Sequence, residues 1–301
     1  MLWLQGWTCV RELRPAFSRE STFLWFCVAL VAICVRNDYA GVTSYVRCLG
    51  LHKLGYNSLL NLFHSRAINL NKLTAAWTSS VIKTGALHLY RVNGRIVCLG
   101  DGIKIAKEGR KMPAVKKLHQ ASQSNSKPTY ILGHSCQSIA LLAERFSYFL
   151  AIPLVSRIHE GLIFPKTQKT TLLDKMAVML QSLNLSHPAY LVADAYYASG
   201  KLIKTLRAQD VHLVTRARSN AVAYQPAKAS TAPRLGRPPV YGDKVKLKNL
   251  FKSSKFVQAD SPVYGEKGQT LEYYTLDLLW LPAGEAVRFV LVKHPKRGST
   301  I

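Results

Sequence analysis

Acidic residues are scarce in this sequence, and that scarcity is its most informative compositional feature. Only 16 Asp and Glu stand against 41 Lys and Arg in 301 residues, which gives a net charge of +25 and an isoelectric point near 10.0. A compact chain with this charge repels itself unless an anionic partner neutralises it, and nucleic acid is the commonest such partner. Ribosomal and membrane-surface proteins share the property, so the charge indicates a class of partner and no activity.

Closely spaced pairs of cysteines, as in zinc sites, are also missing. The six cysteines form no C-x-x-C pair and none follows Cys136, so the nearest approach to a zinc site is Cys48 with His52. A structural zinc site needs two close ligand pairs, and we therefore expect a buried thiol and a surface imidazole there. The histidines lack the local signature of a Ser-His-Asp or Cys-His nucleophile. A low cysteine density in a large basic chain indicates the reducing cytoplasm.

No apolar run is long enough to span a bilayer. The longest, residues 23–35 (FLWFCVALVAICV), would reach about 20 Å as a helix against a hydrocarbon core of roughly 30 Å. Arg11, Arg14 and Arg19 precede it, as in a signal peptide, but the charged residues Arg36 and Asp38 follow where small residues should mark a cleavage site. We expect a buried helix and no stable membrane association; peripheral membrane attachment through this run is the weaker alternative.

The pattern along the chain predicts three regions. Residues 1–85 form a small helical N-terminal region, irregular up to about residue 22. Residues 86–218 combine strand patterns with helices at 170–183 and 200–208, and the strands 189–193 and 211–215 flank the second helix as a parallel βαβ unit. Residues 219–301 begin with a basic loop rich in Pro, Lys and Ser, to about residue 262, and continue as a hairpin turned at 282–284. The sequence stops directly after a strand.

Two aspartates stand apart from the other acids. Asp101 ends the apolar strand 96–100 between two glycines, and Asp194 ends the buried strand 189–193. Carboxylates at the carboxyl edge of an open α/β sheet lie where such sheets bind ligands. Two of them on neighbouring strands could share a divalent cation through oxygen ligands, and the ion would orient a scissile phosphate. The competing interpretation is that each caps a turn or helix.

The stretches 101–113 (DGIKIAKEGRKMP) and 194–201 (DAYYASGK) resemble the first and second aspartate motifs of DDE-type insertion-sequence transposases. The stretches 211–220 and 236–245 are similar to later segments of that family, so the likeness covers about residues 88–300. The resemblance implies an α/β fold, an RNase H-like mixed sheet with flanking helices and a β-rich insertion. Asp101 would lie on the first strand and Asp194 after the fourth, as catalytic ligands of Mg²⁺ or Mn²⁺.

The resemblance also requires a third acid, a glutamate on the last core helix, and the sequence offers none in that context. Each acid after Asp194 lies in a predicted turn, loop or strand: Asp210, Asp243, Asp260, Glu266, Glu272, Asp277 and Glu285. We therefore interpret the chain as C-terminally truncated before that helix, and inactive or nearly so on its own, because a phosphoryl-transfer site works through metal positioning. The alternative is a non-catalytic DNA-binding remnant that occupies DNA or pairs with an intact copy.

Two basic regions are candidate phosphate contacts. Residues 104–117 hold six Lys and Arg, and residues 216–255 hold ten. We select Lys107, Arg110, Lys111, Arg216, Arg218 and Arg237, the last within Gly236-Arg237-Pro238, which resembles the core of an AT-hook. Solvated charged loops are the alternative. The expected partner is double-stranded DNA at transposon ends, bound through the N-terminal region as well, with a homodimer on DNA and a cytoplasmic, nucleoid-associated location of prokaryotic type.

Overall fold

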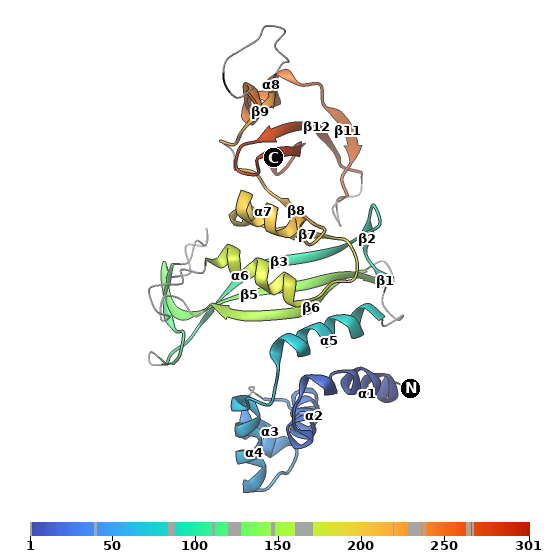
Figure 1. Ribbon diagram of the computed structural model, residues 1–301, viewed down its shortest axis with the longest axis vertical. Helices are drawn as coiled ribbons and strands as arrows, with labels where there is room; N and C mark the ends of the chain where they lie inside the picture. Colours follow the sequence, from blue (N-terminus) through green and yellow to red (C-terminus); the bar gives the residue numbers. More distant parts are fainter. Residues whose placement is uncertain are drawn as a thin grey trace.

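The computed structural model describes most of the chain as three stacked layers (Figure 1). The described residues are 2–38, 41–83, 88–109, 112–119, 128–145, 148–159, 171–218, 220–227, 236, 239–262, 266 and 268–301. Helices form the first layer, a mixed sheet with helices on one face forms the second, and an antiparallel sheet forms the third. The mixed α/β class with N-terminal helices is confirmed, whereas the three domain boundaries stay a prediction.

Helices make up the N-terminal layer: α1 (Leu2–Glu12), the 3-10 turn η1 (Arg14–Ala16), α2 (Glu20–Val35), α3 (Val42–Cys48), α4 (Lys53–His64) and α5 (Leu70–Lys83). The expectation of an irregular segment up to residue 22 was wrong for residues 2–16. Val10 packs against a cluster of Leu13, Phe17 and Phe23, and this apolar contact supports α1.

The apolar run 23–35 lies within α2, so the predicted helix is confirmed. Its burial is partial, because Phe23, Ala29 and Ala32 are buried while Leu24 and Val35 are more than half exposed. The prediction of a buried helix therefore holds for one face only, the face that packs on α3 and α4. Among the described residues, no helix has both the length and the apolarity needed to cross a membrane.

Eight strands of the described part of the chain form the mixed sheet of the second layer: β1 (His88–Leu89), β2 (Arg91–Val92), β3 (Arg95–Ala106), β4 (Lys116–His119), β5 (Tyr130–Arg145), β6 (Tyr148–His159), β7 (Ala189–Ala193) and β8 (Val211–Thr215). The long strands lie in the order β6, β5, β3, β7, β8. Strands β3, β5 and β6 form an antiparallel meander, and β7 and β8 run parallel to β3. The predicted parallel βαβ unit is confirmed.

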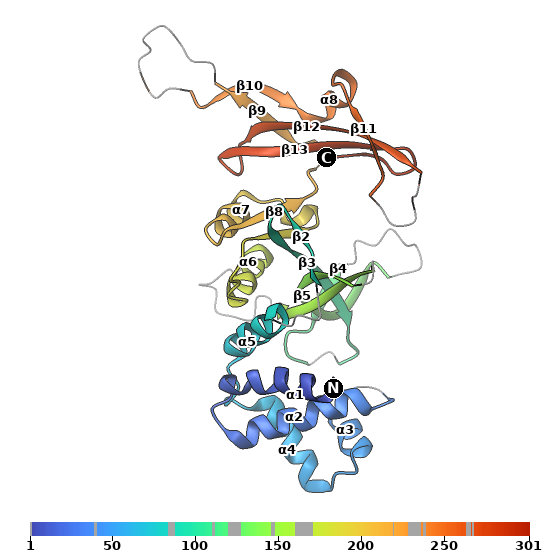
Figure 2. The same cartoon turned by 90° about the vertical axis from the view of Figure 1, so that its right-hand side faces the viewer.

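Helices α5, α6 (Leu172–Ser182) and α7 (Gly200–Arg207) cover one face of this sheet (Figure 2). Their apolar side chains share a single core with the strands, in which Met176, Leu180 and Leu202 pack against Ile96 and Leu191. Thr171 and Asp174 form a reciprocal capping box that fixes the start of α6, as expected for a threonine before an amphipathic run. Helix α5 belongs to this core as well as to the N-terminal layer, since the Trp77 indole donates a 2.9 Å hydrogen bond to the carbonyl of Pro153.

In the residues that the structure describes, the third layer is an antiparallel sheet of six strands with one helix: β9 (Val222–Pro226), β10 (Tyr241–Lys246), α8 (Leu247–Ser253), β11 (Val257–Asp260), β12 (Thr270–Trp280), β13 (Glu285–His294) and β14 (Gly298–Thr300). The predicted hairpin is confirmed, because β12 pairs with β13 from Glu272 opposite Lys293 to Trp280 opposite Glu285. The loop predicted over 219–262 was wrong in part, because β9, β10, α8 and β11 lie within it.

Helix α7 joins the two sheets. A Cβ atom on Gly200 would lie 1.5 Å from the carbonyl oxygen of Pro282, so the start of α7 and the β12–β13 turn approach as closely as a glycine permits. Arg207, at the other end of α7, forms an ion pair with Glu285. Ala283, between these contacts, is buried. The turn of the third layer is thus fixed against the helix that follows Asp194.

Candidate active site

The strand register brings the two predicted aspartates together. Gly100 of β3 pairs with Ala193 of β7, and Ala193 pairs with Thr215 of β8. Asp101 follows Gly100, Asp194 follows Ala193 and Arg216 follows Thr215. Adjacent strands lie about 4.8 Å apart, so two carboxylates and one guanidinium occupy consecutive positions at one edge of the parallel part of the sheet.

Both aspartates lie on the sheet face that α5, α6 and α7 leave uncovered. A Cβ on Gly100 would meet side-chain atoms of Met176 and Leu191 in the helix-covered core, and Ala193 is buried in that same core. Because side chains alternate along a strand, Asp101 faces the other way, and Asp194 occupies the matching place beyond β7. Both residues are exposed. Solvent can therefore reach the pair.

Asp101 was predicted to end its strand, and this was wrong. Strand β3 continues to Ala106, paired with β5 through Ile103 opposite Cys136 and Ala106 opposite Gly133. What ends near Asp101 is the neighbouring strand, since β7 stops at Ala193. Asp101 thus lies just beyond the last residue of β3 that pairs with β7. Its backbone has no strand neighbour on the β7 side, as at the end of a strand.

Each carboxylate is held by one of its oxygen atoms. Asp101 Oδ1 accepts a 2.7 Å hydrogen bond from the backbone N–H of Gly102. Asp194 Oδ1 accepts one of 3.0 Å from the N–H of Tyr196 and so caps the 3-10 helix η3 (Ala195–Tyr197). The carbonyl of Asp194 accepts a 2.6 Å bond from the Thr215 hydroxyl, which ties the end of β7 to β8. The capping interpretation is correct for Asp194, and within the described chain Oδ2 of both residues accepts no hydrogen bond.

A buried polar network supports the pair from the helix side. Gln137 Nε2 donates to the carbonyl of Leu172 at 2.9 Å and to the hydroxyl of Tyr197 at 2.9 Å. Because the carbonyl only accepts, the amide orientation is fixed and the Tyr197 oxygen accepts as well. Burial raises the pKa of Tyr197, and the charges of Asp194 and Asp101 raise it further. The phenol therefore stays protonated near the two carboxylates, and Gln137 links it to the first turn of α6.

This network predicts a loss of stability in Tyr197→Phe. The change leaves one amide hydrogen of Gln137 buried without a partner, which should lower the free energy of unfolding by about 1–2 kcal/mol. Urea denaturation followed by circular dichroism measures the difference. Tyr196→Phe is the matched control, because the Tyr196 side chain is 52% exposed and should tolerate the change. Equal losses in both variants would contradict the role given to the Tyr197 hydroxyl.

The seven acids after Asp194 form ion pairs with other residues or are exposed on strands of the third layer. Ion pairs join Asp210 to Arg95, Glu272 to Lys293, Asp277 to Arg288 and Glu285 to Arg207. Hydrogen bonds from Ser261 and His294, together with the charge of Arg297, lower the pKa of Glu266 to about 2. Asp243 and Asp260 lie on β10 and β11. In the part of the chain that the structure describes, no three His, Cys, Asp or Glu side chains group as a metal site.

The six residues predicted to contact phosphate do not all lie near the two aspartates. Arg216 and Arg218 are exposed just after β8, and Arg216 is the direct neighbour of Asp194 in the register. Lys107 follows β3 six residues after Asp101, about 20 Å away along the strand, so it cannot contact the same phosphate. Arg110, Lys111 and Arg237 lie outside the described residues. As DNA contacts, all six stay predictions.

Gln137 and Tyr197 were missed as supporting residues. Gln137 could have been recognised from the sequence, because it is a large polar residue within the largely apolar strand pattern of residues 136–143. A buried amide in such a strand needs partners, and its partners are located at the site. Tyr197 lies in the second aspartate motif, three residues after Asp194, and its burial was not apparent from the sequence alone.

Comparison with known proteins identifies the family. A search of curated proteins finds no match. Among solved structures, the piggyBac transposase synaptic complex with hairpin DNA is similar with a TM-score of 0.35 and 14% identity, over 94% of this chain and 56% of that one. The chain thus spans little more than half of that transposase, and the likeness is too distant to support an argument. The DDE superfamily endonuclease family matches residues 12–262, and the chain belongs to this family.

Proposed function

We propose that the chain is a transposase-like protein of the insertion-sequence type. Its function would be to bind double-stranded DNA at transposon ends and, in a complete assembly, to cleave and transfer the strand with a divalent metal ion. The observation that carries the proposal is the consecutive placement of Asp101, Asp194 and Arg216 on β3, β7 and β8. Family membership supports the same chemistry.

The donors fit Mg²⁺ or Mn²⁺. Both ions prefer oxygen ligands, and Asp101 and Asp194 each present a carboxylate oxygen that accepts no hydrogen bond from the described residues. A bound ion would lower the pKa of the attacking water or hydroxyl and neutralise charge on the phosphate. The neutral Tyr197 and Gln137 network would hold the β7–α7 connection, and hence Asp194, in place.

Arg216 would bind the DNA backbone beside the carboxylates. Its guanidinium is exposed, and its only hydrogen bond among the described residues is a long 3.5 Å contact to the hydroxyl of Thr300. Guanidinium groups bind phosphate with two parallel hydrogen bonds, which fixes the backbone without reading sequence. Arg218, which is also exposed, follows two residues later. Lys107 would contact the backbone several nucleotides away.

We further propose that the isolated chain binds DNA better than it cuts it. Two carboxylates are too few for a site that positions metal and phosphate together, and no third one joins them within the described residues. The second candidate, a non-catalytic DNA-binding protein that pairs with an intact copy as a homodimer on DNA, is favoured by the same observation. A cytoplasmic, nucleoid-associated location is part of the proposal.

Gel-shift and nicking assays on one preparation test these functions. We expect the purified chain to shift duplex DNA with a steep salt dependence and to nick it weakly or not at all in Mg²⁺ or Mn²⁺. Robust nicking that disappears in Asp101→Asn would contradict the claim of an incomplete site while supporting the carboxylate pair. Absence of any DNA binding would contradict both candidates.

Arg216→Gln should weaken DNA binding and reduce its salt dependence. Loss of one phosphate contact lowers the slope of log affinity against log salt by about 1, uniformly across DNA sequences. Fluorescence anisotropy with labelled duplexes at several salt concentrations measures the slope. Arg91→Gln is the charge-matched control, because Arg91 is exposed on β2 and contacts only the carbonyl of Gly94 within the described chain. Equal slopes in the two variants would remove Arg216 from the interface.

A further inference from the structure

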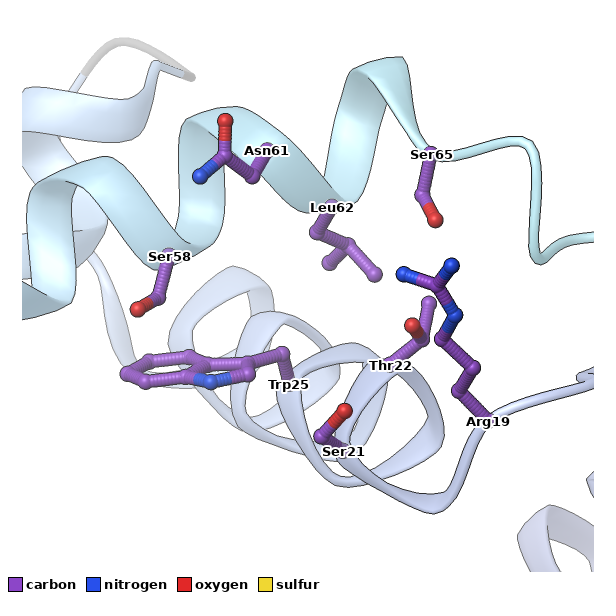
Figure 3. A pocket seen from close by; sticks show the side chains of 8 residues that line it. All are labelled: Arg19, Ser21, Thr22, Trp25, Ser58, Asn61, Leu62 and Ser65. Carbon is purple, nitrogen blue, oxygen red and sulfur yellow. The ribbon is translucent and has the colours of Figure 1, made fainter.

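A pocket of about 230 Å³ lies between α2 and α4 in the N-terminal layer, far along the chain from the aspartates (Figure 3). It is lined by Arg19, Ser21, Thr22, Trp25, Ser58, Asn61, Leu62 and Ser65. Sites that enclose whole drug-sized ligands have volumes of roughly 300–1,000 Å³. This pocket is therefore suited to a small group whose remainder extends into solvent.

One end of the pocket is an aromatic surface with polar groups above it. The indole of Trp25 projects from α2 toward α4, beneath Ser58 and Asn61 (Figure 3). Trp25 is partly buried, with one part packed on the core of α2, α3 and α4. An indole face stacks on any nucleobase, and an asparagine amide can hydrogen-bond to the edge of a base.

The other end is cationic and rich in hydrogen-bond donors. Arg19 lies there with Thr22 and Ser65 (Figure 3). Glu20, the only nearby carboxylate in sequence, pairs with Arg14 at 2.5 Å and leaves Arg19 unpaired among the described residues. Arg19 is the N-cap of α2 and makes no side-chain cap bond, so the first-turn N–H groups of Ser21 and Thr22 also remain available to an anion.

The stacking surface and the anion site are separated by just under one turn of α2, since Trp25 follows Thr22 by three residues. Three helical residues rise about 4.5 Å, which is the scale of the separation between a base and its own 5′-phosphate. The surrounding region favours an anion, because residues 1–85 contain nine Lys and Arg and three Asp and Glu. A neutral planar ligand would leave the Arg19 end unused.

We infer that this pocket binds a single unpaired nucleotide, with its base stacked on Trp25 and its phosphate at Arg19. The nucleotide is either free in solution or a nucleotide displaced from the end of a DNA duplex. Binding at this pocket requires no metal ion and no cleavage. Its failure is therefore distinguishable from failure of the proposed function, which depends on Asp101 and Asp194.

Fluorescence titration of the full chain tests the inference, because stacking on Trp25 should quench its emission. The ligands are deoxyadenosine 5′-monophosphate, deoxyadenosine, a blunt duplex, and the same duplex with one unpaired 3′ nucleotide. We expect saturable quenching by the monophosphate or by the overhang, and about tenfold weaker binding of deoxyadenosine. Quenching by the monophosphate alone identifies a free-nucleotide site, and quenching by the overhang alone identifies a DNA end.

Four variants assign the signal to the pocket. Trp25→Phe should abolish the quenching, and Arg19→Gln should weaken binding of the phosphorylated ligand about tenfold without changing deoxyadenosine binding. The controls Trp7→Phe and Arg66→Gln alter exposed residues outside the pocket and should match the unmodified chain. Full quenching in Trp25→Phe, equal effects of Arg19→Gln and Arg66→Gln, or no quenching by either ligand would overturn the inference.

Discussion

Asp101→Asn and Asp194→Asn should each weaken Mn²⁺ binding about 100-fold, which is the largest effect expected of any single substitution at the site. The two residues are neighbours across β3 and β7, so either change removes one of two charged ligands from the same ion. An amide keeps the size of the side chain and loses its negative charge. Isothermal titration calorimetry on the purified chain measures both affinities directly.

The control for that experiment is Asp260→Asn, which removes an equal charge from exposed β11 in the other sheet. It should bind Mn²⁺ as the unmodified chain does, because its distance from the pair leaves only screened electrostatics. Retention of full affinity in Asp101→Asn or Asp194→Asn would show that the ion, if bound at all, is held by other groups.

Gly200→Ala should lower the free energy of unfolding by about 3 kcal/mol, the upper part of the range for overpacking a fixed contact. The added methyl group would meet the Pro282 carbonyl oxygen at 1.5 Å and its carbon at 2.2 Å, both of them backbone atoms that cannot rotate away. The turn between β12 and β13 must therefore separate from α7. Thermal and urea unfolding, followed by circular dichroism, measure the loss.

The matched glycine is Gly41, where an added Cβ meets nothing within 4 Å and φ is −178°, open to any residue. Gly41→Ala should cost no more than about 1 kcal/mol, because Gly41 is the N-cap of α3 and alanine is a poorer cap than glycine. If Gly200→Ala were equally mild, the contact between α7 and the β12–β13 turn would not constrain the molecule. The third layer would then be held to the site by its polar contacts, such as the Arg207–Glu285 ion pair, and by the chain connection after β8.

The parallel part of the sheet was predictable from sequence because its strands are short, apolar and flanked by clear turns. Residues 189–193 and 211–215 are nearly continuous apolar runs separated by one amphipathic helix, and right-handed βαβ geometry then makes them neighbours. The proximity of Asp101 and Asp194 follows from placing β3 beside β7. That placement was supplied by the family resemblance, because periodicity does not reveal strand order.

Other elements were hidden because their strands are polar. The second half of β3 contains Lys104 and was not predicted as a strand, although Ile103 and Ile105 alternate with Gly102 and Lys104. Strand β10, with the sequence YGDKVK, is an edge strand with one neighbour and buries little, so it has no apolar pattern to detect. Helix α1 was missed because its support comes from the cluster around Phe17, outside its own sequence.

The central claim is that Asp101 and Asp194 hold one divalent ion between them. Fe²⁺ substituted for Mg²⁺, with ascorbate and peroxide, produces hydroxyl radicals that cut the polypeptide only near the bound ion. We expect the polypeptide to be cut at two places, one near residue 101 and one near residue 194. Excess Mg²⁺ should suppress both cuts, and Asp101→Asn should abolish both. Cuts at a single one of these strands, or a pattern that Asp101→Asn leaves intact, would contradict it.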